Sequence, residues 1–370
     1  MSWIDFEIQA LAIVVAVSCA LPGAFLVLRR MALMSDAISH SILLGIVLAF
    51  FVVEDITHPL LILAAAATGV LTVALVEALH RTRKVKEDAA IALVFPALFS
   101  VAVILISRYA GSVHLDLDAV LLGEIAFAPF RRLELWGMDL GPRGLWMMGA
   151  ILLLNLLAIV VFYKELKLST FDAGLAAALG FSPALVHYAF MTLVSVTAVG
   201  AFDSVGSILV VALMIAPPAA AYLLTDRLPL LLVLSGALGA VSAVSGFWLA
   251  RGIDASIAGS MAAMAGVTFL LALLFAPDRG VVAGVRRRAR QRLEFAGVML
   301  AIHVLNHEGG PRARAENRVE HLQEHLRWSP DFARKVVRHA QREGLIASGS
   351  GGELHLTALG REHARHRMLH

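Results

Sequence analysis

The chain has 370 residues, of which 59% are hydrophobic and only 16% are charged, and its mean hydropathy is +0.79. This composition excludes an ordinary soluble globular protein and is typical of a polytopic membrane protein. The single cysteine, Cys19, excludes an intrachain disulfide framework and a thiolate metal cluster within one chain.

Charge divides the chain into two parts. Residues 1–276 hold 14 Lys and Arg against 18 Asp and Glu, whereas residues 277–370 hold 17 against 10, together with nine of the fourteen histidines. Such a shift marks a domain boundary. We predict a transmembrane domain over residues 1–278, a basic linker over 279–292 and a small domain over 293–370.

The first part contains apolar runs long enough to cross about 30 Å of hydrocarbon as helices. They predict nine transmembrane helices, although the sixth run is short, so eight crossings plus a half-helix is an alternative. The first run lacks the features of a cleaved signal peptide, which favours a retained helix. The runs lie at about 8–28, 33–53, 59–79, 89–107, 144–163, 187–202, 206–224, 229–250 and 254–276.

The second run begins with an acid and a histidine four residues apart, Asp36 and His40. On a helix this spacing stacks the two side chains on one face. Ionisable groups beside hydrocarbon usually mark a pathway or a site, and carboxylate with imidazole suits a divalent transition metal. The alternative is that Asp36 caps the helix and a carbonyl satisfies His40.

Two ligands are too few for a tight metal site, so other acids are needed. Glu124, in an apolar run, is the first choice, and Asp203 follows. Asp203 is predicted either to face a pore or to cap the next span.

Two polar connections interrupt the spans. Residues 108–143 include HLDLDAVLLGEIAFAPF, which favours a short helix at the outer surface. Residues 164–183 predict another short helix, ended by Gly180 and Pro183. A transporter whose energy source lies outside the membrane needs such a segment to pass movement to its spans.

Basic residues collect in cytoplasmic loops. If Arg29 faces the cytoplasm, nine basic residues of the connections lie on that side and five on the other. This orientation places residues 285–370 in the cytoplasm and the protein in the cell's inner membrane.

The second part predicts helices at 293–305, around 319–322 and at 329–343, then two short extended runs around a glycine-rich turn and a last basic helix. That order is typical of a winged helix-turn-helix. The predicted fold is therefore an all-α bundle of eight or nine spans plus a small cytoplasmic α+β domain. Two histidine pairs with helical i, i+4 spacing, His303 with His307 and His321 with His325, suggest metal sensing, but solvated helix faces also explain them.

Enzymatic signatures are absent from the sequence: it has no GxxxxGK[ST], GxSxG or HExxH motif. We therefore expect a transport subunit without enzymatic activity, whose ATP would bind to another chain.

Several segments resemble the membrane permease subunit of bacterial ABC importers for manganese, zinc or iron, from about residue 8 to 276. The resemblance implies a homodimer, two cytoplasmic ATPase subunits and an extracytoplasmic metal-binding protein, with the divalent metal as substrate and no permanent cofactor. The segments are RRMALMSDAISHSILLGIVLAFF, KEDAAIALVFPALFSVAVILIS, DLDAVLLGEI, KELKLSTFDAGLAAALGFSP and FDSVGSILVVALMIAPPAAAYLLTDRL.

The resemblance also implies residue roles. Asp36 and His40 match the family's acid and histidine in the translocation path. Phe171, Asp172 and Gly180 match the segment that docks on the ATPase, whereas Glu124 falls where the family is expected to vary.

The segment VVRHAQREGLIASGSGGELHLTALGREHARHRM is similar to the DNA-binding half of metal-dependent repressors of the diphtheria-toxin-repressor type. Such repressors continue into dimerisation and metal-sensing helices where this chain ends. We expect residues 285–370 to dock on the ATPase or on lipid headgroups in a regulatory role, with DNA phosphates as the alternative partner.

The sequence thus predicts the permease subunit of an ATP-driven importer of manganese, zinc or iron. A secondary metal transporter and a membrane-tethered, metal-responsive DNA-binding regulator are the alternatives.

Overall fold

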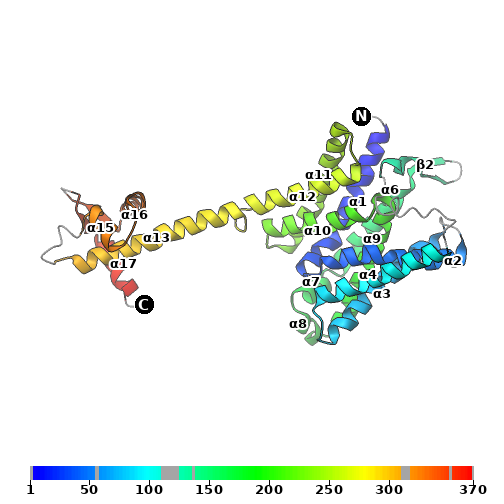
Figure 1. Cartoon of the computed structure of the whole chain (residues 1–370), viewed down its shortest axis with the longest axis horizontal. Coiled ribbons are helices and arrows are strands. Elements are labelled where there is room, and N and C mark those ends of the chain that lie inside the picture. The colour runs from blue at the N-terminus through cyan, green and yellow to red at the C-terminus, as the bar shows by residue number, and fades with distance from the viewer. Residues whose placement is uncertain are drawn as a thin grey trace. The chain divides into compact units, whose positions relative to one another are not determined.

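The chain forms two compact units, Met1–Pro277 and Asp278–His370, which we call unit 1 and unit 2. The computed structural model describes residues 3–54, 58–109, 125–135, 138–309, 317–349 and 352–368. Within these ranges unit 1 is a helical bundle with one small hairpin, and unit 2 combines helices with a second hairpin (Figure 1).

Unit 1 contains, among its described residues, nine helices long and apolar enough to cross a membrane. A helix suits hydrocarbon because it satisfies its own backbone polar groups. The predicted polytopic bundle is therefore confirmed. The helices are α1 (Trp3–Leu28), α2 (Leu33–Val53), α3 (Pro59–Arg81), α4 (Glu87–Tyr109), α6 (Arg143–Val161), α9 (Pro183–Val205), α10 (Ser207–Leu224), α11 (Leu228–Ile253) and α12 (Ile257–Phe275).

Helix α9 differs from its predicted counterpart. It has 23 residues, because its N-cap Ser182 accepts a hydrogen bond from the backbone N–H of Leu185 and so begins the helix before the apolar run. A single residue, Gly206 with φ +79°, separates α9 from α10. The sixth run therefore supplies a full-length helix and not a half-helix.

Close helix contacts in unit 1 depend on glycine. A Cβ added at Gly23 of α1 would lie 2.1 Å from the carbonyl oxygen of Met214 on α10. One added at Gly45 of α2 would lie 2.4 Å from the carbonyl oxygen of Ala64 on α3. Such contacts let helix backbones pack closely in lipid.

One polar network joins three helices inside the apolar core. The buried Asn155 amide of α6 donates to the Ser18 carbonyl of α1 at 3.0 Å and to the Thr197 hydroxyl of α9 at 3.1 Å. A buried amide requires such partners, so the network fixes how these helices meet.

The connection before α6 is described from residue 125 onward, except for residues 136 and 137. A 3-10 helix, η1 (Ile125–Phe130), leads into an antiparallel hairpin of β1 (Arg132–Leu135) and β2 (Met138–Pro142). The arginine and acid side chains that hold this hairpin lie outside the apolar run. The hydropathy pattern therefore does not predict the hairpin. Residues 110–124, with Glu124, lie outside the described residues.

Unit 2 has its own core, in which Leu300, Val336 and Leu354 are buried. Its first helix begins well before the predicted one, so residues expected as a linker lie mostly within α13. The two strands are antiparallel, with Ile346 opposite Leu356. The elements are α13 (Val281–His307), α15 (Val319–His325), α16 (Pro330–Arg342), β3 (Ile346–Ser348), β4 (Leu354–Leu356) and α17 (Ala358–Met368).

Candidate functional site

Asp36 and His40 lie on the first two turns of α2. The helix begins after Ala32 without a side-chain cap, so Asp36 is inside the helix and does not cap it. The Asp36 Oδ1 atom lies 3.3 Å from the His40 Nε2 atom, and the two side chains are 37% and 30% exposed. The two groups therefore face one another, as their spacing predicted, and remain partly exposed.

Two aromatic rings of α4 flank the pair. The Phe95 ring stacks near the His40 imidazole with centroids 5.8 Å apart, and the Phe99 ring meets it edge-on at 6.0 Å. These rings restrict the imidazole, so its nitrogen stays directed toward Asp36.

The pair has no third ligand in the described part of unit 1. Within those residues no other histidine, cysteine or acid lies close enough to make a group of three at Asp36 and His40. The pair alone supplies one oxygen and one nitrogen, which is enough to hold a cation weakly.

Asp203 lies elsewhere. It occupies the last turn of α9, where its Oδ1 atom is 3.5 Å from an Arg131 guanidinium nitrogen, and its side chain is 60% exposed. It does not cap α10, whose N-cap is Gly206. The structure does not bring Asp203 together with Asp36.

The segment after α6 forms two short helices, not the single predicted one. They are α7 (Tyr163–Phe171) and α8 (Ala173–Ala178), and they are separated at Asp172, whose backbone is extended. The Asp172 carboxylate accepts a hydrogen bond from the backbone N–H of Leu175 at 2.8 Å and caps α8. As an N-cap, Asp172 begins α8 directly after α7 ends. The alanine-rich composition of the segment does not indicate this break.

Gly180 ends α8 in a left-handed conformation with φ +87°. The backbone N–H groups of Gly180 and Phe181 donate to the carbonyls of Ala177 and Ala176, each at 3.0 Å. This pattern satisfies the last carbonyls of the helix and favours glycine at its end.

The α7–α8 segment presents apolar side chains outward. Phe171, Leu175 and Leu179 are 61%, 46% and 58% exposed. Apolar residues gathered on a segment that joins two spans are typical of a surface that a partner covers.

Arg29, at the end of α1, holds this segment in place. Its Nε atom donates to the Thr170 hydroxyl and its Nη2 atom to the Ser169 hydroxyl, both at 3.0 Å. The guanidinium also lies 4.7 Å from the centre of the Phe190 ring. Burial lowers the pKa of Arg29 to about 10, so the group remains charged at neutral pH.

In the sequence, Arg29 indicates only the orientation of the chain in the membrane. Its partners lie about 140 positions away in the chain, and no local pattern indicates such a contact.

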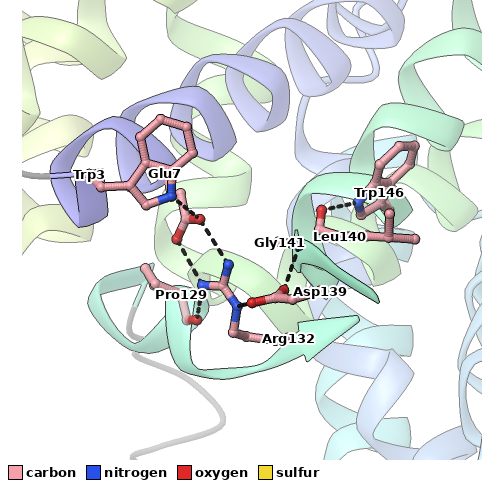
Figure 2. Close-up of polar contacts among 8 residues, drawn as sticks. All are labelled: Trp3, Glu7, Pro129, Arg132, Asp139, Leu140, Gly141 and Trp146. Carbon is pink, nitrogen blue, oxygen red and sulfur yellow. Dashed lines mark hydrogen bonds and ion pairs between the residues drawn. The ribbon is translucent and has the colours of Figure 1, made fainter. Parts of the chain in front are cut away.

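The β1–β2 hairpin is fixed to α1 by a second network (Figure 2). The buried Glu7 carboxylate accepts hydrogen bonds from the Trp3 indole at 2.9 Å and from the Arg132 guanidinium at 3.3 Å. Arg132 also pairs with Asp139, whose other oxygen accepts from the Gly141 backbone N–H at 2.9 Å. The pKa of Arg132 is raised by Asp139 first and then by Glu7.

The family described as "ABC 3 transport family" matches residues 6–276. The chain is 50% identical over 354 residues to "Zinc transport system membrane protein TroD" of Treponema pallidum (strain Nichols), covering 96% of each chain. It is 49% identical over 290 residues to "Manganese transport system membrane protein MntD" of Bacillus subtilis (strain 168), covering 78% of this chain and 98% of that one.

A solved structure, "PsaBC from Streptococcus pneumoniae in complex with Fab", is similar with a TM-score of 0.63 and 29% identity, covering 75% of this chain and 94% of that one. The treponemal alignment covers 96% of this chain and therefore extends into unit 2, whereas the Bacillus subtilis alignment covers 78% of it. The relatives are named as transport membrane proteins and not as enzymes, as expected for this chain. The resemblance predicted for residues 8–276 is confirmed, and the chain belongs to the ABC 3 transport family.

Proposed function

We propose that the chain is the membrane permease subunit of an ATP-driven importer that moves manganese, zinc or iron into the cytoplasm. The observation that carries the proposal is the Asp36–His40 contact of 3.3 Å at the start of an apolar helix. Family membership and the names of the zinc and manganese relatives support it.

The pair suits a site that an ion passes. An ionised carboxylate and a neutral imidazole bind borderline transition metals. Two ligands hold the ion weakly, so it can leave again. Further ligands come from a second copy of the chain in a homodimer or from Glu124. Asp203, which does not lie beside Asp36, would contact the ion at another point of its path.

The movement that ATP binding and hydrolysis drive reaches the permease through the α7–α8 segment. A separate ATPase subunit covers the exposed face around Phe171, with Asp172 and Gly180 setting the geometry of that face. Movement of the segment passes through Arg29 to the end of α1, four residues before α2 begins. Alternating access then exposes Asp36 and His40 to one side of the membrane at a time.

Basic residues collect in cytoplasmic loops, and those near Arg29 support an orientation with this end of unit 1 in the cytoplasm. Asp203 and the β1–β2 hairpin then face outward, where an extracytoplasmic metal-binding protein would deliver the ion. With this proposed orientation, unit 2 lies in the cytoplasm.

Unit 2 is proposed to be a winged-helix domain with a regulatory role. The support is its order of three helices, an antiparallel hairpin and a last helix. Exposed basic residues of α16, such as Arg334 and Arg338, suit the ATPase or anionic lipid headgroups. Specific DNA binding is the alternative, and a gel shift with the full-length protein at physiological salt separates the two.

The decisive experiment is metal uptake in cells that express the permease with its ATPase. We expect the double variant Asp36→Ala, His40→Ala to abolish uptake at a normal membrane level of the protein. Glu54→Gln, at the other end of α2, is the matched control and keeps uptake. Normal uptake by the double variant contradicts the site assignment.

Dependence on the ATPase tests the energy source. We expect the permease to transport metal only when an intact ATPase is present. Uptake into liposomes by the purified permease alone under a proton gradient would establish a secondary transporter instead.

A further inference from the structure

Unit 2 contains a cluster of histidines, apart from the Asp36–His40 pair. One ring nitrogen each from His303, His307 and His325 lies within 4.8 Å of the others. The first two are one turn apart on α13, and the third is at the end of α15. The cluster therefore joins two helices.

The rings themselves are close. The centroids of His303 and His307 are 4.5 Å apart, and that of His325 lies 5.8 Å from the first and 5.9 Å from the second. His321 lies against His325 with centroids 4.6 Å apart. Solvated helix faces account for each i, i+4 pair separately, but they do not account for rings of two helices converging on one point.

The three histidines of the cluster differ in how deeply they are buried. His303 is 8% exposed within the core of unit 2, His307 is half-buried and His325 is exposed. His303 is therefore held in place by packing, and the cluster is open for an ion to enter on the side of His325. Glu308 is adjacent, but its carboxylate is paired with Arg361 at 2.6 Å.

Three imidazoles favour one class of ion. Neutral histidine nitrogens suit zinc, copper, nickel and cobalt, whereas calcium and magnesium require oxygen ligands. Zinc bound to nitrogen at about 2.0–2.1 Å in a tetrahedron places its ligand atoms about 3.3 Å apart. The ring nitrogens of the cluster lie within 4.8 Å of one another. Bringing them to the spacing of a zinc site requires a shift of roughly 1.5 Å, which a rotamer change at the exposed His325 can supply.

We propose that His303, His307 and His325 bind a borderline divalent transition-metal ion, of which zinc is the best fit, with a fourth position open to water. The ion ties α15 to α13. The site does not depend on the proposed function of unit 1, because it rests on the geometry of unit 2 alone.

The test uses the full-length protein, purified without a histidine tag and stripped of metal. Zinc alone is titrated by calorimetry into the protein and into two double variants, His307→Gln with His325→Gln, and His355→Gln with His363→Gln. The second pair is the matched control, because both of its residues are exposed histidines of unit 2 outside the cluster.

The reference protein and both double variants carry Asp36→Asn and His40→Gln, so that the pair in unit 1 contributes no zinc binding. We expect the cluster variant to lose one bound zinc ion per chain and the control to keep it. Equal stoichiometry in the two variants, with both folded by gel filtration, overturns the proposal. An uptake result leaves this outcome unaffected, so the two proposals fail separately.

Cobalt gives a second readout. We expect the visible absorption of a low-coordinate Co²⁺ site in the control and its loss in the cluster variant. A sulfur-to-cobalt charge-transfer band would contradict a site made of histidine alone.

Discussion

Arg29 connects α7, part of the proposed ATPase contact, to the end of α1, next to the helix α2 that carries the proposed metal pair. Its guanidinium donates to two hydroxyl groups of α7 and lies over the Phe190 ring. Hydrogen bonds to a charged group each contribute roughly 1.5–3 kcal/mol. Loss of the guanidinium should therefore release α7 from the end of α1.

We expect Arg29→Gln to reduce ATP-driven uptake strongly while the protein still reaches the membrane. Glutamine is shorter than arginine, carries no charge and cannot donate to both hydroxyl groups from the two nitrogens that arginine uses. The measurement is metal uptake together with ATP hydrolysis in reconstituted vesicles, where hydrolysis should persist. Arg30→Gln, at the exposed neighbouring arginine, is the control, and an equal defect in both variants would contradict the role of Arg29.

Single residues were predictable from sequence only where their partner is local. The Asp36–His40 contact follows from i, i+4 spacing, because a helix stacks those positions. In the sequence, Arg29 and Arg132 indicate only loop charges, because the partners of Arg29 and one of the two acids that pair with Arg132, Glu7, are far away in the chain.

The β1–β2 hairpin illustrates how an element can be fixed by charge. The pKa of Asp139 is lowered, first by the backbone N–H of Gly141 and then by Arg132. Its folded pKa thus lies below its unfolded one. The stabilising contribution of the carboxylate is complete above the unfolded pKa and is lost as the pH falls through the folded one.

We therefore expect Asp139→Asn to lower the apparent melting temperature at about pH 7, and this effect to shrink as the pH is lowered and the native carboxylate is protonated as well. The measurement is thermal unfolding of the detergent-purified protein across that range. A difference that grows as the pH falls would contradict this assignment.

At the level of elements, hydropathy predicted the spans well. It failed where capping or charge decides the structure. Asp172 separates α7 from α8 and Ser182 lengthens α9, each through one side-chain hydrogen bond to the backbone. The basic stretch before residue 293 continues as helix α13, because arginine is a good helix former even without an apolar face.

The whole molecule is modular, since units 1 and 2 have separate cores. The Bacillus subtilis relative is matched over 98% of its length by 78% of this chain. We expect a chain ended after Pro277 to reach the membrane and support uptake, and to lose the zinc site of unit 2.

The measurement is uptake per amount of protein in the membrane, with the full chain beside it. Absence of uptake by a well-expressed truncated chain would show that unit 2 is needed for transport itself.

The close contact at Gly23 has a consequence for mutational tolerance, which the open surroundings of Gly149 bring out by contrast. Alanine at Gly23 would collide with the Met214 carbonyl, whereas a Cβ at Gly149, inside α6, meets nothing within 4 Å. Alanine inside a helix is favoured over glycine by about 1 kcal/mol. A saturation library selected for growth on scarce metal should therefore retain alanine at Gly149 and eliminate every substitution at Gly23, and survival of bulky residues at Gly23 would show that α1 and α10 can separate without loss of fitness.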